Sequence, residues 1–232
     1  IVKCDGAYIN DRAYVRDYVN ESDQEAILES IRDAARRSDV VIATLHTHEG
    51  ENENWYATYA PKFVEEFARK TIDAGATCFV GQGAHFPRGV EVYKGCPIFY
   101  NLGSLLMEFE SGESMISPEM YETYHLGPDA HPSDLHSNRA QKPDGSWNGF
   151  YSERRFSTNF LVVLDIDEEG ANYEIVPLDL DMHRENNLKR GLPEVSTPEE
   201  GKKFADYLAH ASERYGVSFT YCEEIGAISF DA

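Results

Sequence analysis

Two short apolar runs, separated by one amphipathic segment, constrain the fold of this chain more than any other feature. Residues 40–45 read VVIATL and residues 76–80 read ATCFV, and neither run alternates polar with apolar side chains. Unbroken runs of this length are typical of strands that are covered on both faces of a sheet. Between them, residues 61–73 place apolar side chains at helical spacing, and Gly75 ends that segment. The order strand, helix, strand predicts an α/β layered core.

Further elements are predicted on both sides of this core. Residues 1–21 are polar and rich in tyrosine, without a clear period, and are expected to form a loop. The other expected elements are a helix behind a Ser22–Glu25 capping box that ends near Arg37, strands over 89–93 and 97–100, a β-hairpin over 160–166 and 171–178 that returns to the sheet, a helix from Thr197 to Gly216, and an edge strand within 217–230.

One long segment does not fit the regular pattern. From Ser111 to Ser157 the composition changes to Pro, Gly, Ser, Asp, Asn and aromatic residues, with no sustained period. We expect one main body over residues 1–232, in which 111–157 is an insertion or flap and 196–232 is a C-terminal helix and tail. The insertion carries His125, His131 and His136 in turn-rich surroundings, which favours solvated or structural roles for these histidines.

The charge and the cysteines exclude several classes of function. The chain has 41 acidic and 21 basic residues, a formal net charge of −20, so DNA, RNA and anionic membranes would be repelled. Its four cysteines form no CxxC pair, and neither a zinc ribbon nor a redox motif is supported. We find no run of about 18 apolar residues and no basic leader followed by an apolar run, so neither a membrane span nor a signal peptide is expected.

Histidines follow both core strands directly. His46 and His48 come at the end of the first apolar run, and His85 follows the second run after Gly81-Gln82-Gly83-Ala84. In α/β sheets, ligand sites gather at the carboxyl ends of the strands. An imidazole held on a rigid strand end suits a divalent cation such as zinc or manganese, whereas the alternative is a set of ordinary surface-loop histidines.

Three segments resemble one protein family. Residues 89–103, GVEVYKGCPIFYNLG, are similar to the "xEVYxGxPIFYSLGNF" run of the CapA family, the poly-γ-glutamate capsule synthesis proteins. Residues 81–85, GQGAH, resemble that family's Gly-His-x-Pro-His loop, and residues 39–46, DVVIATLH, resemble its "DVVIVSLHWG" strand. The chain resembles the C-terminal part of such a protein, clearly over 22–104 and loosely as far as Leu180.

The resemblance implies a fold and a metal centre. The family resembles calcineurin-like metallophosphatases, so the expected fold is a metallophosphatase-like α/β sandwich of two mixed β-sheets flanked by helices. A divalent metal (Mn, Zn or Fe) would lie at the strand ends, with two ions in the full-length protein. By position His46 and His85 are metal ligands, and Gln82 replaces the loop's first histidine, so that metal position is weakened, lost or bound through the amide oxygen. We add His48 as a ligand on its chemistry alone.

Two functions remain open from the sequence. The first is a metal-dependent hydrolase or transferase acting on a phosphoester or an amide, in which His46 or His48 assists proton transfer. The second is a non-catalytic accessory or polymer-binding protein with a degenerate metal site. The partner would be a small-molecule or polymer substrate, and an N-terminal segment or second chain would complete the fold, because the family's N-terminal half is absent here. The family's link to cell-surface polymers favours the envelope, and the unpaired cysteines leave the cytoplasm open.

Overall fold

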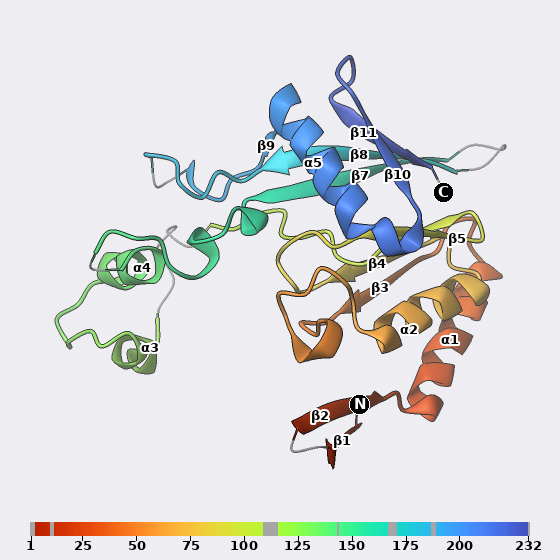
Figure 1. The fold of residues 1–232 in the computed structure, drawn as a ribbon, viewed down its shortest axis with the longest axis horizontal. Coiled ribbons are helices and arrows are strands. Elements are labelled where there is room, and N and C mark those ends of the chain that lie inside the picture. The colour runs from red at the N-terminus through yellow and green to blue at the C-terminus, as the bar shows by residue number, and fades with distance from the viewer. Residues whose placement is uncertain are drawn as a thin grey trace.

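Two sheets lie one above the other, with α1 and α2 on the lower side of the lower sheet (Figure 1). The structure, a computed structural model, describes residues 3–9, 12–108, 116–142, 144–166, 171–186 and 189–231. The layered α/β arrangement is the expected fold class, with one sheet mixed and the other antiparallel. Within the described ranges no helix is both long enough and apolar enough to cross a membrane.

The lower sheet contains both histidine-bearing strand ends. Its strand order is β3-β4-β6-β5, and its strands are β3 (Ile42–His46), β4 (Cys78–Gln82), β5 (Val90–Tyr93) and β6 (Cys96–Phe99). β3, β4 and β6 are parallel, whereas β5 runs antiparallel to β6 across the Lys94-Gly95 turn. The helices α1 (Glu21–Ala35) and α2 (Lys62–Asp73) accompany this sheet. The strand, helix, strand order predicted from residues 40–80 is therefore confirmed, to within two residues at the strand boundaries.

The upper sheet corrects one expectation. Its strands are β7 (Thr158–Ile166), β8 (Ala171–Asp179), β9 (Glu194–Val195), β10 (Ser218–Cys222) and β11 (Ala227–Asp231). β7 and β8 form the predicted hairpin, but they join β10-β11 and β9 in a separate antiparallel sheet and do not return to the first. The C-terminal tail likewise forms a whole hairpin, whose β11 pairs with β8, and not one edge strand. The predicted turn at Glu168-Glu169-Gly170 lies outside the described residues.

Two apolar cores hold these layers together. In the first, Val64, Ala68 and Ile72 of α2 pack against Phe79 and Ile98 of the lower sheet. The second lies between the sheets and includes Val90, Phe99, Phe160, Ile175, Ile228, Phe204 and Leu208. The last two belong to α5 (Pro198–Ala211), whose N-cap is Thr197, as the sequence predicted. β4 is buried along most of its length, whereas β3 is buried on one face only: Ala43 is buried, but Ile42 and Thr44 are exposed, so the prediction that both strands are covered on both faces is wrong for β3.

The N-terminal segment differs from its prediction. It forms a hairpin, β1 (Lys3–Ile9) and β2 (Arg12–Tyr18), whose strands pair only with each other among the described strands. Helix α1 then begins behind Asn20, because the Asn20 Oδ1 atom accepts hydrogen bonds from the backbone N–H groups of Ser22 and Asp23. The Ser22 capping box is thus wrong: Ser22 already lies inside the first turn.

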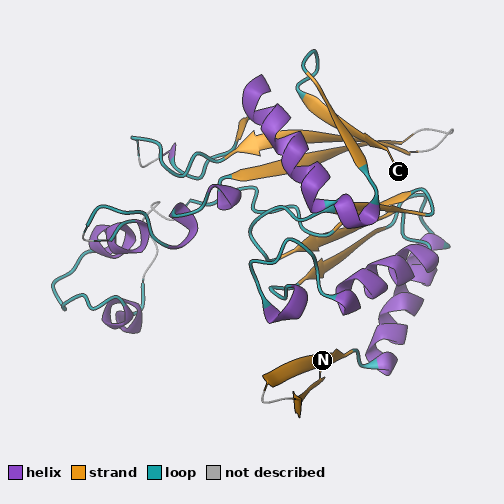
Figure 2. Ribbon diagram, in the orientation of Figure 1, coloured by secondary structure: helices purple, strands orange, loops and turns teal. Residues whose placement is uncertain are grey.

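The insertion has more regular structure than its composition suggested. It contains α3 (Pro118–Thr123), α4 (Pro132–Ala140) and the 3₁₀ turns η2 (Gly149–Tyr151) and η3 (Arg154–Phe156). Figure 2 shows α3 and α4 as short helices joined by long loops, to one side of the sheets. At the start of α4, the backbone N–H of His131 donates to the Asp134 carboxylate at 2.8 Å. Residues 109–115 and 143 lie outside the described residues.

Candidate functional site

The two strand ends bring the predicted histidines together. His46 and Gln82 are paired positions on the parallel strands β3 and β4, and the Thr47 N–H extends this pairing by donating to the Gln82 carbonyl at 2.9 Å. The Nε2 atoms of His46 and His48 lie 3.4 Å apart. The His85 ring centroid lies 5.9 Å from that of His48. Residues from two separate loops therefore form one cluster of imidazoles.

The distance between the two Nε2 atoms suits a bound cation. Zinc–nitrogen bonds of about 2.0–2.1 Å at tetrahedral angles place two ligand nitrogens about 3.3 Å apart. Without a cation, the same separation is that of a long hydrogen bond in which one neutral ring donates to the other. Both rings are exposed, so the pair is open to solvent and to a ligand.

His85 is held by a group that the sequence analysis missed. Its Nδ1 atom lies 2.9 Å from the Ser104 Oγ atom, and the Ser104 N–H donates to the carboxamide of Asn159, which is buried. This leaves Nε2 as the free ring nitrogen of His85. A hydrogen bond to the other ring nitrogen is the usual way to orient a metal-ligating histidine. The similarity of residues 89–103 to the CapA run stops one residue before Ser104, and Asn159 lies on another sheet.

His85 also has an unusual backbone. Its φ is +65°, in the left-handed region that costs a non-glycine residue about 1–3 kcal/mol. Burial, and then the neighbouring His48 and His46, lower the pKa of His85, which keeps the ring neutral and able to offer a lone pair. A neutral ring that is oriented through Nδ1 can act as a ligand through Nε2.

The two histidine loops approach each other as closely as their backbones permit. A Cβ atom on Gly83 would lie 2.5 Å from the Thr47 carbonyl oxygen and 3.0 Å from the His48 ring. Gly83 also has a φ of +110°, which other residues rarely adopt. Glycine at this position therefore allows the Gln82–His85 loop to pack against the His46–His48 loop.

Aromatic side chains form one wall of the cluster. The Trp55 ring lies 6.5 Å from both His48 and His85, and Phe150 of the insertion lies 5.2 Å from His85. Trp55 and Phe150 also pack onto the apolar cluster that joins the insertion to this region. Trp55 therefore both borders the histidine cluster and packs in an apolar core.

The cluster offers suitable donors but not a complete coordination shell. Among the described residues, no group of three or more His, Cys, Asp or Glu side chains is close enough to hold a metal ion. His46 and His48 fit as a pair of ligands, and His85 is oriented nearby. Gln82 is exposed at the end of β4, on the same edge. Structural zinc needs about four donors and catalytic zinc about three plus water, so any metal here needs movement of these side chains or a further ligand.

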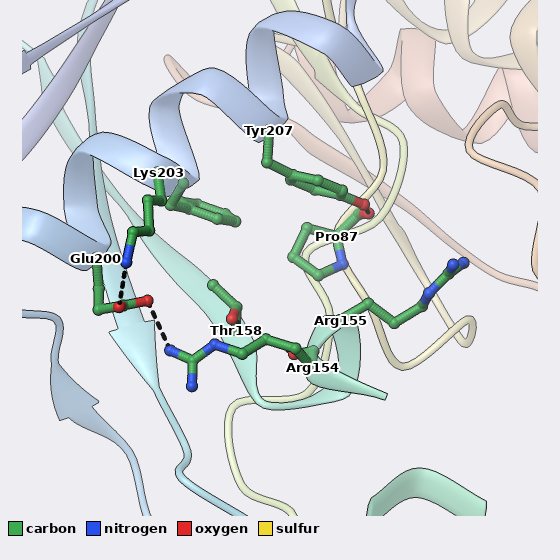
Figure 3. A pocket seen from close by; sticks show the side chains of 8 residues that line it. Pro87, Arg154, Arg155, Thr158, Glu200, Lys203 and Tyr207 are labelled. Carbon is green, nitrogen blue, oxygen red and sulfur yellow. Dashed lines mark hydrogen bonds and ion pairs between the residues drawn. The ribbon is translucent and has the colours of Figure 1, made fainter. Parts of the chain in front are cut away.

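A separate cavity lies beside α5. It has a volume of about 570 Å³ and is lined by Pro87, Arg154, Arg155, Thr158, Glu200, Lys203, Phe204 and Tyr207. Figure 3 shows the Glu200 carboxylate between Lys203 and Arg154, while the Arg155 side chain extends away from it. None of the clustered histidines lines this cavity, although Pro87 follows His85 by two residues.

Cys78 and Cys96 contribute to neither site. Cys78 is buried at the start of β4, and burial raises the pKa of its thiol to about 11. Cys96 is half-buried, and burial also raises its pKa. Neither thiol is a ready nucleophile or metal ligand at neutral pH.

The similarity to known proteins includes the region that carries the histidine cluster. Residues 5–108 match the family model described as bacterial capsule synthesis protein PGA_cap. Over these residues the chain is similar to the CapA family. The match includes β3 to β6 and therefore His46, His48, Gln82 and His85.

Individual relatives agree with the family match. The chain is 28% identical over 214 residues to an uncharacterized protein of Sinorhizobium fredii, a match that covers 90% of this chain and 45% of the relative. It is 36% identical over 75 residues to a probable polyglutamine synthesis accessory protein of Mycobacterium tuberculosis, covering 32% of this chain and 18% of that one. It is 30% identical over 105 residues to the PGA biosynthesis protein CapA of Bacillus subtilis, covering 45% and 26%. The chain thus spans less than half the length of these curated relatives.

Proposed function

We propose that this chain supplies part of a divalent-metal centre in a CapA-type protein of capsule or poly-γ-glutamate biosynthesis, acting as a metal-dependent hydrolase or transferase on a phosphoester or an amide. The 3.4 Å separation of the His46 and His48 Nε2 atoms, next to an oriented His85, is the observation that carries this proposal. A divalent cation such as zinc, manganese or iron would supply Lewis-acid polarisation and a water of lowered pKa.

The side chains have distinct roles in this proposal. His46, at the end of β3, and His85, oriented by Ser104, act as ligands through nitrogens held by rigid elements. His48 lies on the loop and is exposed, so it either completes the ligand set or, when it is not a ligand, exchanges a proton with the substrate. The Gln82 amide oxygen is the remaining donor on this edge. Trp55 and Phe150 limit access of water on one side.

A metal at this site needs further ligands, and a segment that carries them could pair with the open edge of the lower sheet. β3 is the terminal strand of its sheet, and Ile42 on it is 51% exposed. A parallel strand added at this edge would end beside His46 and could bring further ligands to it. We infer that a segment or chain equivalent to the part of the relatives that this chain does not match occupies that edge.

An assay with a chelator tests the catalytic proposal. The purified chain, loaded with zinc, manganese or iron, is assayed on bis(p-nitrophenyl) phosphate and on γ-glutamyl-p-nitroanilide. We expect turnover of one substrate class that EDTA abolishes and that His46→Ala lowers at least about 100-fold, while His210→Ala on the exposed face of α5 leaves it unchanged. Turnover that survives both EDTA and His46→Ala would contradict the proposal.

A non-catalytic accessory role is the second candidate, and the cavity beside α5 favours it. That cavity has the size of a ligand site but contains none of the clustered histidines. In this role a polymer would bind there with equal affinity before and after EDTA treatment, and Lys203→Ala, at an exposed lining residue, would weaken it. Isothermal titration with poly-γ-glutamate separates the two functions, because only the metal-centre proposal makes binding depend on the cation.

A further inference from the structure

Arg88 is a charged side chain enclosed by the protein. It is 1% exposed, the largest of the fully buried side chains, and it follows His85 by three residues. No ion pair links it to a carboxylate of a described residue. Burying a guanidinium without a counter-ion is costly, so a side chain of this kind is expected only where its hydrogen bonds serve a purpose.

The guanidinium binds one loop at two points. Its Nη1 atom donates to the Glu49 carbonyl at 2.7 Å, and its Nη2 atom donates to the Trp55 carbonyl at 3.0 Å. The two carbonyls lie at opposite ends of the segment that follows His48. The planar fork of arginine can hold two acceptors at fixed spacing, which lysine, with a single ammonium group, cannot do in the same way.

The loop is built tightly around this group. A Cβ atom on Gly50 would lie 1.8 Å from the Asn54 carbonyl oxygen and 3.2 Å from Nη2 of Arg88. The Arg88 backbone N–H donates to the Asn101 carbonyl, which ties the same residue to the segment that carries Ser104. One residue thus connects the loop of His48 and Trp55 with the strand-end loop of His85.

We propose that Arg88 is a positioning residue: its two hydrogen bonds to the Glu49 and Trp55 carbonyls fix His48 and Trp55 against His85, so that imidazoles from two strand ends are presented as one site. The part of this inference that concerns a metal rests on the proposed function. The part that concerns the order of the loop does not, and it is measured without metal.

Arg88→Lys tests this inference, in a Trp147→Phe background where Trp55 is the sole tryptophan. In metal-free protein we expect acrylamide quenching of Trp55 to rise about threefold and amide exchange over residues 47–55 to accelerate at least about tenfold, with α2 unchanged. Zinc affinity should fall about tenfold. Arg69→Lys is the matched control, because Arg69 forms an equivalent two-point contact with Glu91, away from this loop.

These experiments distinguish failure of the inference about Arg88 from failure of the proposed metal site. Unchanged quenching and exchange in Arg88→Lys would overturn the inference, as would a loosened loop with unaltered zinc affinity. If the parent protein binds none of zinc, manganese and iron, the proposed function fails while the loop measurements still decide the role of Arg88. If Arg88→Lys does not fold, ¹⁵N-arginine spectra of the parent decide it: two distinct, slowly exchanging Nη signals are expected, and one averaged signal would contradict the inference.

Discussion

The histidine cluster and the cavity beside α5 both contain polar side chains, but these side chains are partnered in different ways. In the cavity, Arg154 is shared by Asp179 and Glu200, and Lys203 also binds Glu200, so the charges neutralise one another. In the cluster, the Nε2 atoms of His46 and His48 face each other across 3.4 Å. Mutually satisfied charges stabilise a fold, whereas ring nitrogens that converge without a counter-ion are available to a ligand. This contrast predicts that substitutions in the histidine cluster change metal binding, whereas substitutions in the cavity change only the stability of the fold.

The largest expected effect lies where the two histidine loops meet. Gly83→Ala should lower the free energy of unfolding by on the order of 2–4 kcal/mol, because the new Cβ meets the Thr47 carbonyl and φ is positive. Gly95→Ala is the control: its φ is also positive, but nothing lies within 4 Å of its Cβ, so about 1 kcal/mol is expected. Urea denaturation measures both, and equal losses would mean that the close approach of the loops is not real.

The next prediction concerns a substitution that should weaken metal binding with little effect on stability. Ser104→Ala removes the partner of His85 Nδ1, so zinc affinity should fall about tenfold while the free energy of unfolding changes by no more than about 1 kcal/mol. Competition with a chromogenic chelator measures the affinity. Ser229→Ala, at an exposed hydroxyl on β11, should change neither quantity. A Ser104→Ala protein with unaltered zinc affinity would show that His85 needs no orientation.

Substitutions in the cavity beside α5 should change stability only slightly and should not change metal content. The Arg154 side chain is 57% exposed, and solvent screening limits its ion pairs with Asp179 and Glu200. Arg154→Ala should therefore cost less than about 1 kcal/mol and leave zinc content unchanged. Loss of zinc in this variant would show that the two sites are coupled, and it would contradict the contrast drawn between them.

The smallest effect depends on pH. Lys203 in particular, together with Arg154, holds the pKa of Glu200 below its usual value. A carboxyl group with a lowered pKa stabilises the fold above its unfolded pKa of about 4.3, and that contribution is lost as the pH falls through the folded pKa. Glu200→Gln should therefore be less stable than the parent by under about 1 kcal/mol at pH 7 and equally stable near pH 3. A difference that grows towards low pH would contradict the assigned partners.

The parts of the fold that follow local patterns could be predicted from the sequence. α2 carries its apolar residues at helical spacing, and the runs before His46 and Gln82 are strands of one sheet, as expected. The separate upper sheet could not be predicted, since β8 pairs with β11 about fifty residues later and no local pattern encodes that partner. The hairpin over 3–18 was missed because its polar residues show no period.

The candidate site could likewise be predicted only in part. His46, His48 and His85 were found because they stand at or just after the ends of two apolar runs in the sequence. Ser104 and Arg88 were not found, because their roles depend on contacts with His85 and with two backbone carbonyls that only the folded loops create. The assignment of these histidines as ligands stays a prediction.

Metal stoichiometry tests the central claim most directly. The purified chain is supplemented with zinc, manganese and iron, desalted and measured by plasma mass spectrometry beside a His46→Ala/His85→Ala double variant and the His210→Ala control. We predict about one equivalent of one metal in the parent and the control, and less than about one-tenth of an equivalent in the double variant. Equal metal content in all three proteins, or none in the parent after supplementation, would contradict the claim that this histidine cluster is a metal centre.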